Sequence, residues 1–80
     1  VPEYMEKISP EMLTKSISQL PVQFRTVLNL FAIEGYKHKE IAQKLNISEG
    51  ASKSYYSRSK EQLKVILQKQ ILEMLLQKVV

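Results

Sequence analysis

The chain has 80 residues, a formal net charge of +4 and no cysteine. This length allows one domain with a core sufficient for a small helical bundle, and the lack of cysteine excludes a disulfide scaffold or a thiolate metal site. No signal peptide and no apolar run of about 18 residues is visible, so a soluble protein of the reducing cytoplasm, away from membranes, is expected. A start at Val1 rather than Met indicates a fragment of a longer protein.

The first predicted helix follows a linker over residues 1–8. It begins at residues 9–11, Ser-Pro-Glu, where serine is a good N-cap, proline suits the first helical position and an acid suits the first turn. Pro21 ends it, because the residue before a proline is disfavoured in the helical conformation. The apolar stripe expected to face the core, at spacings i, i+4 and i+7, consists of Leu13, Ile17 and Leu20.

The second predicted helix spans roughly residues 21–34 and supplies most of the core. Gly35 is its natural C-terminal cap, since glycine adopts the left-handed conformation without a steric penalty. The apolar face expected to be buried consists of Phe24, Val27, Leu28 and Phe31, widened by Leu30 and Ile33.

A tight break between two helices is the most informative part of the chain. Residues 37–45 predict a third helix with Ile41 and Leu45 on one stripe. Asn46 tolerates the left-handed conformation that a helix end needs, and Ser48 is a good N-cap for the next helix. This is the arrangement of a helix-turn-helix, in which the second helix lies in the DNA major groove.

The fourth predicted helix starts near Ser48 and meets neither proline nor glycine after Gly50. The stripe expected to face the bundle consists of Ser52, Tyr56, Ser59, Leu63 and either Ile66 or Leu67. Residues 68–80 form an apolar extension that should continue the helix or follow after a bend. So much apolar surface predicts burial against the first helices or against another chain, and self-association is the favoured expectation, with a separate protein partner as the alternative.

The positive charge is concentrated on the helix-turn-helix. Residues 36–60 contain six Lys or Arg against two Glu, a net charge of +4, whereas residues 1–35 contain three against four, a net charge of −1. Residues 61–80 have a net charge of +1. A basic face is often just a solvated surface. Here it coincides with the helix-turn-helix, which favours phosphate contacts and therefore nucleic-acid binding.

The residues expected to contact DNA lie on the first turns of the fourth helix and at the start of the third. Arg58 can pair with a guanine or clamp a phosphate, and Ser54 and Ser57 are short enough to approach bases closely. Lys53 and Arg58, about 140° apart around the helix, are expected to straddle the groove. The complete predicted set is Lys37, His38, Lys39, Ser48, Glu49, Gly50, Ala51, Lys53, Ser54, Tyr55, Ser57, Arg58 and Lys60.

The other members of this set have more general roles. Gly50 and Ala51 leave the helix start uncrowded, so that backbone N–H groups there can meet a phosphate. Glu49 can accept from a cytosine amine or simply complement the helix dipole. Residues 37–39 are expected to touch phosphates, with His38 at the surface and not a metal ligand, since it is the single histidine of a chain without cysteine. An exposed Tyr55 ring could stack on a sugar or touch a thymine methyl.

Several of these motifs together resemble region 4 of the sigma-70 family, in the manner of the extracytoplasmic-function (ECF) group of sigma factors. The resemblance covers roughly residues 17–67. It is carried by Gln19-Leu20-Pro21, Arg25, Val27, Leu30, Glu34-Gly35-Tyr36, Lys39-Glu40-Ile41-Ala42, Leu45, Ile47-Ser48-Glu49-Gly50, Lys53-Ser54 and Ser57-Arg58. The chain departs from the family pattern at Asn46, often glycine, at Ser52, often β-branched and apolar, and at Tyr55, often polar or basic.

The resemblance implies an all-α fold, a four-helix bundle without a wing in which three helices form the core and the C-terminal helix is long. It also implies a domain, here residues 9–67, that reads the minus-35 element of double-stranded promoter DNA and docks on the beta flap of RNA polymerase. An anti-sigma factor is a further implied partner. The region that melts the minus-10 element has no counterpart in this sequence, so this chain alone should not open a promoter.

Two other functions compete with this interpretation. A response-regulator output domain of the LuxR type shares the four-helix layout and binds DNA as a dimer, although Leu20-Pro21, Arg25 and residues 50–54 fit a sigma factor better. A protein-interaction module would use the apolar C-terminal helix and never touch DNA. An enzyme is not expected, because the sequence holds no catalytic triad, P-loop or paired carboxylates, and no cofactor is implied.

Overall fold

The computed structural model describes residues 8–79 of the chain, with side chains up to residue 77. This part is helical and contains no strand, so the all-α helix-turn-helix fold predicted from the sequence is confirmed. The predicted linker lies outside the described residues except for Ile8. The elements in chain order are α1 (Pro10–Ser18), α2 (Val22–Leu28), the π-helical turn η2 (Asn29–Ile33), α3 (His38–Leu45) and α4 (Glu49–Val79).

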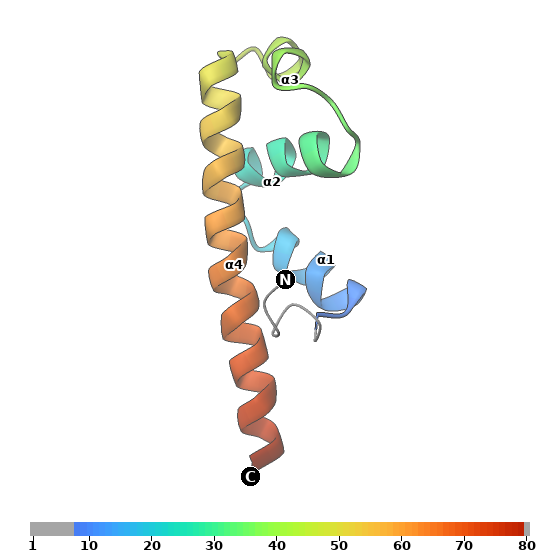
Figure 1. The fold of residues 1–80 in the computed structure, drawn as a ribbon, viewed down its shortest axis with the longest axis vertical. Helices are drawn as coiled ribbons and strands as arrows, with labels where there is room; N and C mark the ends of the chain where they lie inside the picture. The colour runs from blue at the N-terminus through green and yellow to red at the C-terminus, as the bar shows by residue number, and fades with distance from the viewer. Residues whose placement is uncertain (1–7, 80) are drawn as a thin grey trace.

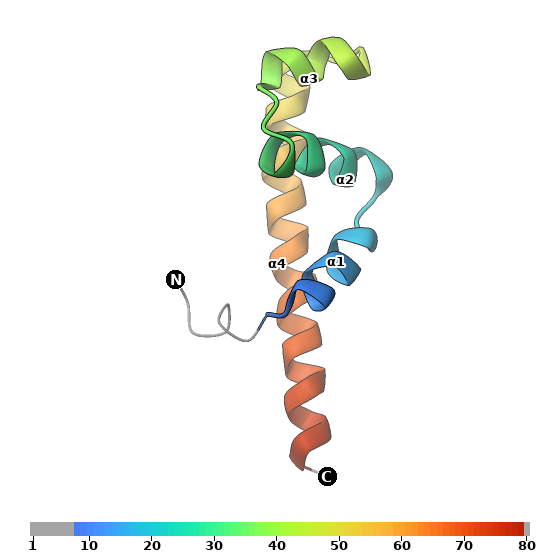
Figure 2. The same ribbon diagram turned by 90° about the vertical axis from the view of Figure 1, so that its right-hand side faces the viewer.

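Helix α4 is the spine of the molecule. Figures 1 and 2 show α1, α2 and α3 stacked along one side of it, with α3 at the end where α4 begins and α1 near the middle of its length. The C-terminal end of α4 projects beyond α1 in both views, and the principal extents are 50 × 20 × 18 Å. The two ends of α4 therefore have different surroundings.

Helix α1 begins as the sequence predicts but presents a different face. The Ser9 hydroxyl accepts the N–H of Met12 at 3.1 Å, which confirms the N-cap. Leu20, just after the helix, is buried and Ile17 is half-buried, but the expected burial of Leu13 is wrong because its side chain is exposed. Ser16 is fully buried in its place, since a small residue lets α1 approach α4 closely.

Helix α2 carries the centre of the core and is tied to α1. Val27 and Leu28 are buried, as predicted, whereas Ile33 is 67% exposed and does not widen the buried face. Arg25 Nη1 donates to the carbonyl oxygen of Ser18 at 3.1 Å. This bond caps an otherwise free carbonyl at the end of α1 and fixes the angle between the two helices.

The predicted second helix ends in a wider turn that the sequence pattern did not show. The N–H of Glu34 donates to the carbonyl of Asn29 at 3.0 Å, five residues back, as in a π-helix. Gly35 then adopts a φ of +79°, which confirms its expected place at the helix end. The N–H of Tyr36 bonds back to the carbonyl of Leu30 at 2.9 Å and closes the turn.

Small buried residues set the distance between α4 and its neighbours. Ser59 of α4 is fully buried, like Ser16 of α1. Each hydroxyl donates to a carbonyl of its own helix, Ser59 to Tyr56 at 2.6 Å and Ser16 to Met12 at 2.8 Å. Close packing is thus reached without leaving a buried hydroxyl unpaired.

The C-terminal half of α4 is only partly covered in the described structure. Leu67 and Ile71 are buried against the bundle and Met74 is half-buried, whereas other apolar side chains are exposed. The helix continues without a bend, so residues 68–77 extend α4 and do not form a separate element. None of the described helices combines the length and the apolar character that a membrane span requires. The exposed apolar residues are Val65, Leu72, Leu75 and Leu76.

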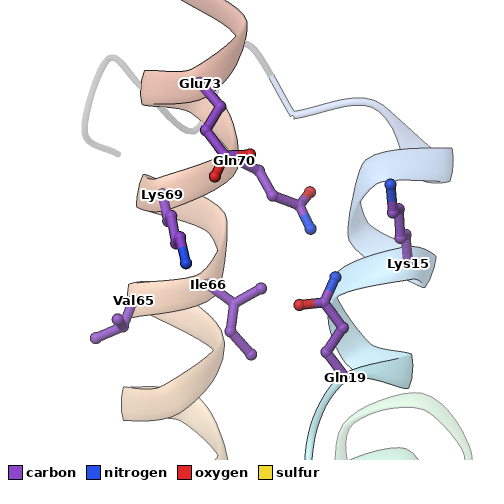
Figure 3. Close-up of a pocket in the computed structure, with 7 residues that line it drawn as sticks. All are labelled: Lys15, Gln19, Val65, Ile66, Lys69, Gln70 and Glu73. Carbon is purple, nitrogen blue, oxygen red and sulfur yellow. The ribbon is translucent and has the colours of Figure 1, made fainter.

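A shallow groove separates α1 from this part of α4. Figure 3 shows Lys15 of α1 and Gln19, the residue just after α1, on one side of the groove, and Ile66 and Gln70 of α4 on the other. Val65, Lys69 and Glu73 complete the lining. The groove carries mixed charge and amide tips with no convergent arrangement, so it offers no evident site for a small molecule.

Self-association through this apolar surface, expected from the sequence, stays a prediction. Replacing Leu72 and Leu76 together with glutamate should convert an oligomer to a monomer, because each charge would be buried in any interface formed there. Light scattering coupled to gel filtration measures the mass. A wild-type chain that is already monomeric at high concentration would contradict the expectation.

Candidate DNA-recognition site

The turn between α3 and α4 has the backbone geometry that the sequence predicts. Asn46 lies in the left-handed region with φ 54° and ψ 49°, and the N–H of Ile47 bonds to the carbonyl of Ala42 at 3.0 Å. The Ser48 hydroxyl accepts the N–H of Ala51 at 2.9 Å and caps α4. Ile41 of α3, fully buried, pins the pair of helices to the core.

The start of α3 carries two exposed lysines next to an N-terminal capping hydrogen bond. The N–H of Lys37 donates to Glu40 Oε1 at 3.0 Å, so the Glu40 carboxylate is engaged within the first turn. Lys37 and Lys39 have exposed side chains and form no ion pair among the described residues. Both side chains are therefore free to reach a phosphate, and that contact stays a prediction.

The exposed face of the first turns of α4 has serines at its centre and cations at its flanks. Ser54 and Ser57 are exposed and three residues apart, so they lie side by side on the helix. Lys53 and Lys60 are seven residues apart and share one flank, whereas Arg58 lies on the other. These five residues, hereafter the reading face, have short side chains at the centre and long basic side chains at the edges.

The lysines of the reading face are held only weakly. Lys53 Nζ lies 4.0 Å from Glu49 Oε1, and both side chains are more than half exposed, so the pair contributes little and can open. Lys60 Nζ lies 4.6 Å from the ring centroid of Tyr56. This cation–π contact draws Lys60 toward the bundle, and it must be given up or shared if Lys60 binds a phosphate.

The backbone at the start of α4 is less open than the sequence suggested. The N–H of Ala51 is already bonded to Ser48, so it is not free for a phosphate. The N–H groups of Glu49 and Gly50 have no partner among the described residues and remain available. Gly50 is exposed and Ala51 half-buried, which keeps this end of the helix uncrowded.

The expectation of an exposed ring at Tyr55 is wrong. Its ring is half-buried and packs against Phe24 of α2, with centroids 5.6 Å apart. A ring held there cannot stack on a sugar without leaving α2. Any contact of Tyr55 with DNA is restricted to its outer edge and stays a prediction.

His38 also departs from its expected place at the surface. It is half-buried, its ring stacks on Phe31 with centroids 4.1 Å apart, and its Nδ1 lies 2.9 Å from the Ser52 hydroxyl. Sequence reasoning missed this bond between the two helices of the motif. Its one signal in the sequence was a serine at position 52, on the stripe expected to face the bundle.

The comparison with protein families decides the identity of this motif. The family model for "Sigma-70, region 4" matches residues 11–63, more than half of the chain. This chain belongs to the sigma-70 region 4 family. The family consists of DNA-binding regulatory domains and not of enzymes.

One curated relative agrees with the ECF character of the resemblance. The region 4 chain is 36% identical over 56 residues to the ECF RNA polymerase sigma factor SigM of Bacillus subtilis (strain 168). The match covers 70% of this chain and 34% of that relative, so the matched part spans about a third of that relative's length. No solved structure matches it significantly.

The match places the predicted site within the family's own span. All thirteen predicted contact residues fall inside residues 11–63, whereas the exposed apolar part of α4 lies beyond it. Region 4 therefore includes the reading face, and the C-terminal extension is a feature that the family match does not cover.

The cap of α4 should be measurable on its own. Ser48→Ala should lower the free energy of unfolding of region 4 by about 1 kcal/mol, because the N–H of Ala51 loses its partner. Thermal denaturation followed by circular dichroism measures the change. Ser54→Ala is the matched control, since its hydroxyl is exposed and unbonded among the described residues, and its stability should be unchanged or slightly higher. Equal stabilities for the two variants would contradict the assigned cap.

Proposed function

We propose that this region 4 domain reads the minus-35 element of a promoter on behalf of an ECF sigma factor. The observation that carries the proposal is the reading face, an exposed strip of short side chains bordered by basic ones at the start of a helix-turn-helix. The family and the printed name of the Bacillus relative support the same function.

The proposed binding mode follows from the side-chain lengths. The major groove is wide enough for a helix, and the bases lie at its floor. Ser54 and Ser57 bring the backbone of α4 close to that floor. Lys53 and Lys60 reach one wall of phosphates and Arg58 the other wall or a guanine at its edge. Glu61, one turn beyond Ser57, places a negative charge where the helix must leave the groove.

The charges of the described residues favour DNA contact through the end of the molecule that holds the helix-turn-helix, and not through the C-terminal end of α4. The exposed cations Lys37 and Lys39 continue the basic surface onto α3. The C-terminal half of α4 instead exposes Leu72 and Leu76, which a duplex would not bind. Apolar surface of that kind fits a protein, and the partners implied by the resemblance are the beta flap of RNA polymerase and an anti-sigma factor.

The family match also weighs against the LuxR-type alternative, which binds paired half-sites as a dimer. A region 4 domain should bind one site as a single copy.

Fluorescence anisotropy with a library of short duplexes resembling minus-35 elements, at low and moderate salt, tests the proposal. A clear preference among sequences supports it. Uniform binding that falls steeply with salt would reduce the reading face to a basic surface.

Two substitutions test the placement of the reading face. Lys53→Ala and Arg58→Ala should each weaken binding to the preferred duplex by about 1–3 kcal/mol if these residues reach bases, or lower the salt slope by about 1 if they reach phosphates. Lys69→Ala removes the same charge from the exposed far half of α4 and serves as the control. Wild-type affinity and salt slope in both test variants would refute this orientation of α4.

A further inference from the structure

We propose that Ser52 fixes His38 as the tautomer protonated at Nε2, and that this outward N–H donates to a backbone phosphate of the bound duplex. The inference rests on the proposed function, since it assigns one contact of the DNA complex. It differs from the expectation of a freely exposed histidine, because the contact depends on a buried serine of the other helix.

The ring of His38 is held on two sides. It stacks on Phe31 with an interplanar angle of 12° and lies 5.8 Å from the ring centroid of Tyr56. Phe31 belongs to η2 and itself packs against Tyr56 at 4.5 Å. The imidazole therefore cannot turn freely, and its two nitrogens have distinct surroundings.

The Ser52 hydroxyl decides which nitrogen carries the proton. Ser52 is fully buried, and among the described residues its hydroxyl bonds only to His38 Nδ1, at 2.9 Å. The hydroxyls of Ser16 and Ser59 instead donate to their own helices. A buried O–H without an acceptor is costly, so Ser52 donates and Nδ1 accepts. A neutral imidazole that accepts at Nδ1 carries its proton at Nε2.

The second nitrogen is open to a ligand. His38 Nε2 has no hydrogen-bond partner among the described residues, yet no buried side-chain nitrogen or oxygen there lacks a partner, so Nε2 reaches solvent. Its exposed neighbours in sequence are Lys37, the N-cap of α3, and Lys39, whose charges attract a phosphate, while the Glu40 carboxylate is engaged by the cap. An N–H donor between two cations suits a phosphate oxygen.

The arrangement depends on the serine at position 52. A β-branched apolar residue, frequent at position 52 in the family that the sequence resembles, has no hydroxyl to give to a histidine. Here the bond joins the first turn of α3 to the first turns of α4. A phosphate held by His38 is thereby placed at a fixed distance from the reading face, which sets the register of α4 along the groove.

The tautomer can be observed directly, because His38 is the only histidine of the chain. Long-range proton–nitrogen correlation spectra at pH 8 should show a single tautomer with the proton on Nε2. Ser52→Ala should give a mixture, and Ser52→Thr, which keeps the hydroxyl, should restore the single form. A proton on Nδ1 in the wild type, or the same spectrum in all three chains, would overturn the assignment.

Binding measurements test the phosphate contact. His38→Asn places an amide near Nδ1 and has nothing at Nε2, whereas His38→Gln places an amide near Nε2. The asparagine variant should bind the preferred duplex about two- to twelvefold more weakly, and the glutamine variant should recover most of the loss. Because the donor is neutral, the salt slope should stay unchanged in both, in contrast to Lys39→Ala, which should lower it.

The outcomes separate this inference from the proposed function. Wild-type affinity in His38→Asn, or a salt slope lowered as in Lys39→Ala, would overturn the neutral phosphate contact while DNA reading stands. A wild-type chain that binds all duplexes equally would remove the proposed function, and the two His38 variants on any of these duplexes would still decide the phosphate contact. A wild-type chain that binds no duplex would remove both, and the tautomer spectra would then decide the role of Ser52 alone. Circular dichroism confirms that each variant folds, and Ser52→Thr serves if Ser52→Ala does not.

Discussion

The reversal between α3 and α4 is the constraint on which the rest of the molecule depends. Asn46 takes a left-handed conformation and Ser48 caps the next helix, so that one helix stops and another starts within three residues. Ile41 holds α3 on the core while this happens. This geometry leaves the first turns of α4 with one side packed on the bundle and the opposite side free, which a helix that reads DNA requires.

The two halves of helix α4 have different surroundings. Its first half packs through the fully buried Ser52 and Ser59 and presents short and basic residues outward, whereas its second half exposes Leu72 and Leu76. Because the helix is continuous over Glu49–Val79, whatever binds the far half is connected to the reading face by an unbroken rod. The family match ends at residue 63, between these two halves.

Local signals predicted the helix ends well, because each depends on one or two residues. Ser9, Gly35, Asn46 and Ser48 all act as the sequence indicates. The misplaced residues depend on packing instead. Leu13 and Ile33 fit an apolar period but are exposed, because α1 buries the small Ser16 and the π-helical turn shifts the end of the second helix. The contact of His38 with Ser52 spans 14 residues and could not be read from local spacing. Tyr55 is similar, since its partner Phe24 lies in another helix.

The most direct test of the account is a nuclear magnetic resonance titration of the whole chain with its preferred duplex, followed through the backbone amides. The largest shift changes should fall at residues 37–39 and 48–60, while residues 65–77 of α4 should change little. Changes concentrated in the apolar half of α4, with none at the reading face, would contradict it and would assign this chain to protein binding alone.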